Sequence, residues 1–116
     1  MIPARGVSAV VVILFLIALG NAAAPGITIQ APSNTTYINT TLDLNYTVTD
    51  TGSGVDKCWY SLDANASNIT ITSCANTTMG SLEDGNHSVT VYANDSAGIA
   101  NSSTAYFSVD TSTTMT

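Results

Sequence analysis

The two cysteines are the residues of this sequence with the most direct chemistry. Cys58 and Cys74 bound the segment CWYSLDANASNITITSC, which reads as two short strands joined by a polar turn. A metal site or a reactive thiol would need further partners, but the chain has one histidine, no third cysteine and no C-x-x-C spacing. We therefore predict a disulfide between Cys58 and Cys74, worth about 3 kcal/mol of stability in the chain-entropy model.

Asparagine side chains form a second group with possible chemistry. Nine of the ten asparagines begin an Asn-x-Ser/Thr triplet without proline, whereas chance would give about three at this Ser and Thr content. One explanation is that turns rich in Ser, Thr and Asn produce such triplets by composition alone. The other is N-glycosylation, in a host that has the enzyme. Glycans need exposed positions. We predict glycosylation at the nine triplets, which begin at Asn34, Asn39, Asn45, Asn65, Asn68, Asn76, Asn86, Asn94 and Asn101.

A catalytic site is not predicted. His87 is the only imidazole, and its place after a turn at the start of a strand favours a solvated side chain. Glu83 and Asp84 are adjacent, so an extended backbone points them apart rather than at one substrate. We expect this chain not to be an enzyme and to need no cofactor.

Calcium is the one metal with some support. Four aspartates fall at turns or strand ends, where hard oxygen ligands at the pole of a β-sandwich could coordinate Ca²⁺. No ligand spacing of a known calcium loop is present, and aspartates in turns commonly bond their own backbone. The candidate ligands are Asp50, Asp56, Asp95 and Asp110.

The charge balance excludes one class of partner. Lys and Arg total 2 against 8 Asp and Glu, and the formal net charge is −6. Nucleic-acid binding needs clustered cations on the protein surface. We therefore expect no nucleic-acid partner.

The first 22 residues read as an export segment. Arg5 precedes an apolar run over 7–19, and small residues then favour signal-peptide cleavage after Ala22. An uncleaved membrane anchor is the alternative, because 7–24 is just long enough to span a bilayer. A third interpretation is a resemblance of 5–8 to archaeal pilin-like N-termini, which are cut before the helix. Each of these exports the remainder, and a cysteine pair becomes a disulfide in an oxidising exterior.

The exported part is predicted to be all β. Short stretches with one apolar face alternate with turn signals, which describes an antiparallel two-sheet sandwich behind a hydrophobic N-terminal helix. Turns are expected at 50–54, 83–86 and 95–98. The expected strands are 27–30, 42–49, 57–63, a short one around Ile69 and Ile71, 87–93 and 104–110.

The motif order resembles a known module. CWYSLD, a later cysteine, LEDGNHSVTVYANDSAG and a closing FSVDT together resemble the immunoglobulin-like repeats of archaeal and bacterial surface proteins. This resemblance implies an immunoglobulin-like sandwich over 26–110, followed by a Thr-rich tail or linker at 111–116. The second cysteine lies only 16 residues after the first, so the antibody-type bridge between sheets is missing and antibody-like recognition loops are not assumed.

Three aromatic residues are candidates for an interaction patch. Period-2 counting places Trp59, Tyr92 and Tyr106 opposite to the inward sets of their strands. If these strands are neighbours in one sheet, the rings form an exposed patch that could stack on sugar or on an adjacent module. The alternative is that Trp59 faces inward or is covered by the cysteine hairpin.

We predict a non-catalytic extracellular structural or adhesion module of a secreted or cell-surface protein. Its partners would be other surface modules or glycans, and it would touch a membrane only through an uncleaved N-terminal segment. The alternative is a carbohydrate-binding module or a pilin-like filament subunit, which would need the aromatic patch or the retained helix.

Overall fold

The computed structural model describes residues 23–65 and 67–112 of the 116-residue chain. The predicted signal or anchor segment 1–22 lies outside the described residues, as do 113–116 of the predicted tail. No helix in the described part is long and apolar enough to cross a bilayer. The elements are β1 Gly26–Ala31, β2 Thr36–Tyr37, β3 Leu42–Thr49, β4 Val55–Leu62, β5 Ile69–Ile71, the 3-10 turn η1 Thr72–Cys74, β6 Thr77–Met79, β7 Gly85–Asp95 and β8 Ala100–Val109.

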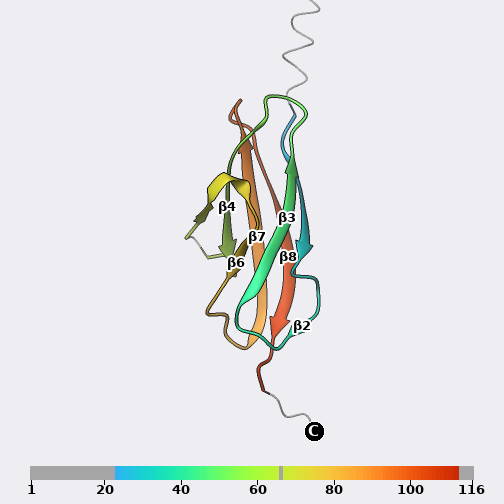
Figure 1. Cartoon of the computed structure of the whole chain (residues 1–116), viewed down its shortest axis with the longest axis vertical. Coiled ribbons are helices and arrows are strands. Elements are labelled where there is room, and N and C mark those ends of the chain that lie inside the picture. Colours follow the sequence, from blue (N-terminus) through green and yellow to red (C-terminus); the bar gives the residue numbers. More distant parts are fainter. Residues whose placement is uncertain (1–22, 66, 113–116) are drawn as a thin grey trace, which may run out of the picture.

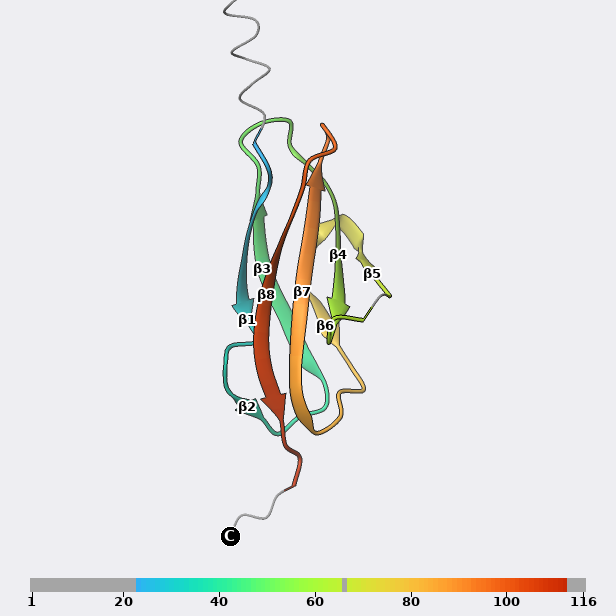
Figure 2. The same cartoon turned by 180° about the vertical axis from the view of Figure 1, so that it is seen from behind.

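The strands form two sheets that face each other (Figure 1, Figure 2). One has the order β1-β3-β6 and the other β2-β8-β7-β4-β5. All pairs are antiparallel except the two-residue contact of β2 with β8, which is parallel. The predicted all-β, two-sheet sandwich is confirmed.

The core lies between the sheets and follows the period-2 pattern of the long strands. In β3, Leu42, Leu44 and Tyr46 are buried while the residues between them are exposed or half-buried. Such alternation gives each strand one face for the core and one for solvent. The other strands and the β6–β7 connection add further core side chains, namely Cys58, Tyr60, Ile71, Met79, Leu82, Val89, Val91, Ala93, Phe107 and Val109.

Two loops fasten the sandwich at the end where β1 begins. The β3–β4 loop contributes the Gly54 carbonyl, which accepts a hydrogen bond from Ser96 N at 3.0 Å. Ser53 Oγ accepts another from Ala97 N at 3.1 Å. Gly54 has a φ of 96°, a conformation that glycine adopts without a steric penalty. The segments predicted as turns, 50–54 and 95–98, are therefore joined by hydrogen bonds.

The structure corrects the prediction of a tight turn at 83–86. Gly85 already pairs with Val109 as the first residue of β7, and only Asp84 bends the chain. The reason is that β6 and β7 belong to different sheets, so the chain crosses the sandwich instead of forming a hairpin. Leu82, which is 4% exposed, anchors this crossing in the core.

Two strands were not predicted from the sequence. β2 has two residues and β6 has three, too few to show an alternating pattern. Each is a strand because a longer one lies beside it: Tyr37 is opposite Val109 of β8, and Met79 is opposite Leu42 of β3.

Candidate functional site

The imidazole of His87 is held in place rather than solvated, contrary to the expectation from its position. Its side chain is 10% exposed and stacks on the Phe107 ring, with centroids 5.4 Å apart. Nδ1 lies 2.9 Å from Asp63 Oδ2, and Nε2 lies 2.6 Å from the Glu83 carbonyl oxygen. The hydrogen bond to the Glu83 carbonyl raises the pKa of His87 above 6.5, and the Asp63 carboxylate raises it further. Both ring nitrogens therefore have partners, and the imidazole links the residues just after β4 to those just before β7. We call His87 with Asp63 and Glu83 the histidine clamp.

Asp84 also has a structural role. Its Oδ1 accepts hydrogen bonds from Thr111 N at 2.9 Å and from Thr111 Oγ1 at 3.0 Å. Thr111, the first residue of the predicted tail, is therefore held against the β6–β7 connection. Glu83 contributes its main-chain carbonyl to the clamp, and its side chain is exposed.

Cys58 and Cys74 form a disulfide, with Cα atoms 5.1 Å apart. Cys58 lies on β4 and is buried, whereas Cys74 ends η1, directly after the three-residue edge strand β5. Ser73 and Cys74 have left-handed φ angles of 56° and 52°, which turn the chain back toward β4. The bond joins β4 to the turn that follows the edge strand of the same sheet and does not connect the two sheets, which agrees with the expected absence of an antibody-type bridge.

The three candidate aromatics lie on strands that are neighbours in the five-stranded sheet. Trp59 and Tyr92 are directly opposite each other on β4 and β7, and their rings stack with centroids 5.6 Å apart and planes 6° apart. Both residues are half-buried. Because stacked rings cover each other's faces, this pair presents edges and one outer face each, not one flat platform.

Tyr106 stands apart from that pair. It is 64% exposed and lies opposite Ser88, four residues along β7 from Tyr92, or about 13 Å at the rise of a strand. Thr90 and Thr104 fill the space between, joined by a hydrogen bond of 2.9 Å. The structure thus brings two of the three rings together and leaves the third isolated.

The nine predicted glycosylation sites differ in their surroundings. Asn45 and Asn94 are half-buried, and the other seven are exposed. Asn76 and Asn94 use their amide oxygens to accept hydrogen bonds from main-chain N–H groups, which leaves the nitrogen that would carry a glycan out of those bonds. In Asn101 the nitrogen itself donates to the Pro25 carbonyl at 2.8 Å.

The four candidate calcium ligands do not gather at one place. Asp50, Asp56 and Asp95 lie at the end where the β3–β4 loop meets the β7–β8 turn, and Asp110 lies at the other end, directly after β8. Asp56 is exposed beside a bulge in β4, and Asp110 bonds Ser112 N, a local contact that lowers its pKa. Among the described residues, no three His, Cys, Asp or Glu side chains form a metal-binding group.

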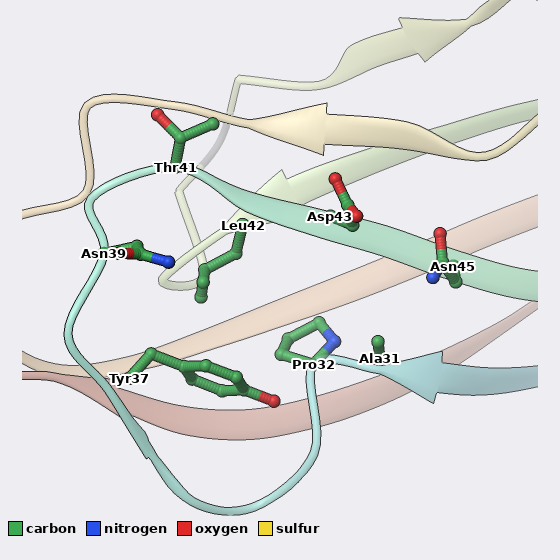
Figure 3. A pocket seen from close by; sticks show the side chains of 8 residues that line it. All are labelled: Ala31, Pro32, Tyr37, Asn39, Thr41, Leu42, Asp43 and Asn45. Atoms are coloured by element: carbon green, nitrogen blue, oxygen red, sulfur yellow. The ribbon is translucent and has the colours of Figure 1, made fainter.

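A cleft of about 300 Å³ was not predicted (Figure 3). It lies where the end of β1, the β2 segment and the start of β3 meet. Tyr37, Pro32 and Leu42 supply apolar surface, and Asn39 and Asn45, both predicted glycosylation sites, belong to its lining together with Ala31, Thr41 and Asp43. No local pattern could reveal it, because three segments build it.

Comparison with known proteins agrees with this architecture. The family model described as a bacterial Ig domain matches residues 25–91. A solved structure of the fibronectin(III)-like modules of Clostridium thermocellum CbhA is similar, with a TM-score of 0.60 and 18% identity over 73% of this chain and 97% of that chain. At this identity the likeness shows the fold alone. No curated protein matches the sequence.

Proposed function

Because the chain belongs to the bacterial Ig domain family, we propose that residues 26–110 serve as a non-catalytic structural and adhesive module of a secreted or cell-surface protein. The observation that carries this proposal is the direction of the chain. β1 enters at one end of the sandwich and β8 leaves at the opposite end (Figure 1). Modules arranged in this way can be joined in series, each adding about 35 Å, the length of its longest strands.

The Cys58–Cys74 disulfide supports a location outside the cell. Disulfides persist in oxidising compartments and are rare in a reducing cytosol. The nine Asn-x-Ser/Thr triplets point in the same direction, because glycans are added to exported proteins and need the exposed positions that most of these asparagines occupy.

The proposed non-catalytic role rests on what the titratable side chains already do. The His87 ring is hydrogen-bonded to Asp63 and to the Glu83 carbonyl, and the Asp84 carboxylate accepts a hydrogen bond from Thr111 N. A general acid or base must be within hydrogen-bond reach of a substrate. These side chains instead hold the ends of strands.

A test on intact cells addresses location first. A membrane-impermeant amine reagent should label Lys57, which is exposed on β4, without lysis, and a cytoplasmic protein should stay unlabelled as the control. Alkylation followed by mass measurement should find no free thiols. Labelling only after lysis, or two free thiols in protein from the cell exterior, would reject the proposal.

Carbohydrate binding is the second candidate, favoured by the exposed Tyr106 ring and the outer faces of the Trp59–Tyr92 stack. Aromatic rings stack on sugars through their faces. Tyr106→Ala should weaken retention on a polysaccharide affinity column if the module binds sugar. Ser103→Ala, on the opposite face of β8, is the matched control.

A further inference from the structure

Asp95 has a buried carboxylate oxygen that makes no hydrogen bond. The residue is 2% exposed and ends β7. Its Oδ1 accepts hydrogen bonds from Ala97 N at 3.0 Å and from Ile99 N at 2.8 Å, which shape the turn into β8. Its Oδ2 is buried and has no partner.

Asp50 shows the same asymmetry at the same end of the sandwich. Its Oδ1 accepts a hydrogen bond from Gly52 N at 2.8 Å, and its Oδ2 is buried without a partner. Asp50 directly follows β3, two residues after half-buried Val48, and Asp95 ends β7, two residues after buried Ala93. The two carboxylates therefore stand at the ends of strands from opposite sheets, where the β3–β4 loop is hydrogen-bonded to the β7–β8 turn.

No positive charge of the described residues compensates these oxygens. Lys57 is the one Lys or Arg in that part of the chain, and it is exposed. The ion pair among the described residues joins His87 and Asp63, and it lies at the opposite end of the sandwich from Asp50 and Asp95. Burying a carboxylate without a counter-charge or a hydrogen bond is costly. A bound cation would remove that cost.

The usual spacing of facing sheets suits a calcium ion. Such sheets lie about 10 Å apart and an Asp side chain reaches roughly 3 Å from its backbone, so carboxylates that approach from opposite sheets can come within the order of 4 Å of each other. Two oxygens that bind one Ca²⁺ at 2.3–2.6 Å are separated by at most about 5 Å. Ca²⁺ also accepts main-chain carbonyls and water as ligands.

We infer that a divalent cation, by its ligand chemistry Ca²⁺, binds at this end of the sandwich between Asp50 and Asp95. Main-chain carbonyls and water complete the coordination. Because the protein supplies two carboxylates, the affinity falls in the range of extracellular calcium modules, about 10⁻⁴–10⁻³ M. The ion fastens the β3–β4 loop to the β7–β8 turn, adding to the Ser96–Gly54 hydrogen bond.

The test is thermal unfolding of the full exported chain in EDTA and in about 10 mM CaCl₂, with circular dichroism as the readout and calorimetric titration of CaCl₂ alongside. The wild-type Tm should rise by at least about 5 °C with calcium. Asp95→Asn keeps an oxygen for the two turn hydrogen bonds but removes the charge. It should abolish the rise, and in EDTA its Tm should equal or exceed that of the wild type. Asp50→Asn should abolish the rise as well.

Asp110→Asn is the matched control, because it removes the same charge at the opposite end and should keep the full calcium response. An equal loss of response in Asp95→Asn and Asp110→Asn would mean that calcium acts only by screening the net negative charge, and would overturn the site. A wild-type Tm that does not change with calcium, with no heat of binding, would also overturn it.

Discussion

His87 shows how one side chain can link three segments. Its ring stacks on Phe107 of β8, and its two nitrogens face Asp63 at the end of β4 and Glu83 before β7. A neutral imidazole can donate from only one nitrogen, whereas the imidazolium can donate from both. The two acceptors therefore favour the protonated form.

This preference gives a pH dependence with a definite sign. The folded-state pKa of His87 is raised above 6.5, so its contribution to stability is full below about pH 6.5 and is lost as pH rises through the folded-state value. We expect the Tm to fall between about pH 6 and pH 9, measured by circular dichroism. His87→Asn should flatten that slope. A wild-type Tm that stays constant over this range would contradict the clamp.

The disulfide acts at the scale of an element, on the β4–β5 hairpin. β5 has three residues and lies at the edge of its sheet, so few contacts hold it. Cys58 and Cys74 fasten the chain that follows β5 to buried positions of β4. An edge strand this short depends on such a constraint.

Removing the disulfide should therefore destabilise the folded state. Replacing both Cys58 and Cys74 by Ala is expected to lower the free energy of unfolding by about 2–5 kcal/mol, measured by urea denaturation. Wild-type protein with reducing agent should show a similar loss, and reducing agent should leave the double variant unchanged. A loss below about 1 kcal/mol would show that β5 is held by its strand pairing alone.

The Trp59–Tyr92 stack is a second feature of this scale, because it joins β4 to β7 on their outer face. Cross-strand aromatic pairs help to fix the register of antiparallel strands. The pair thus stabilises the sheet whether or not it binds a ligand.

A double-mutant cycle separates this effect from burial. Trp59→Ala and Tyr92→Ala should each destabilise the fold, with a coupling energy of about 0.5–1.5 kcal/mol between them in urea denaturation. Tyr106→Ala should change the free energy of unfolding by less than about 0.5 kcal/mol, because this ring is mostly exposed. A coupling energy near zero would mean that the stack adds nothing beyond burial.

At the scale of the whole molecule, the end-to-end course of the chain and the positions of the Asn-x-Ser/Thr triplets fit one function, that of a module in a series. The chain enters the sandwich at one end and leaves it at the other. The asparagines of the triplets lie on both sheets and in the loops. A glycosylated module would carry sugars on several sides, which would shield its sheets from edge-to-edge pairing with other chains.

Glycan occupancy should follow the surroundings of each asparagine. Glycopeptide mass spectrometry of protein from the native cell exterior is expected to find high occupancy at exposed Asn34 and Asn39. Lower occupancy is expected at half-buried Asn94 and at Asn101, whose amide nitrogen is engaged. Unmodified peptides at all nine triplets would refute glycosylation.

The same preparation tests the fate of residues 1–22. N-terminal sequencing should give a mature start at Ala23, because Gly20 and Ala22 fit the small positions before a signal-peptide cut. A start at Val7 would support a pilin-like subunit, and an intact Met1 a membrane anchor.

The sequence by itself determined the fold class and most of the long strands. Strand β3 was predicted with the bounds that the structure shows, because LDLNYTVT alternates over eight residues with one face buried. The disulfide also followed from the sequence, since a chain with two cysteines has one possible pairing within it. Both depend on signals that lie close together along the chain.

Only the tertiary structure decided which side chains meet. Two-residue β2 is a strand because β8 lies beside it, and His87 is half-buried because Asp63, just after β4, and Phe107 of β8 reach it from other parts of the sheet. Period-2 counting gives the face on which a ring lies but not its position along the neighbouring strand. Strand register sets that position, and it pairs Trp59 with Tyr92 while placing Tyr106 four residues away. The proximity of Asp50 and Asp95 has the same origin, because hydrogen bonds between two distant loops bring the ends of β3 and β7 to one place.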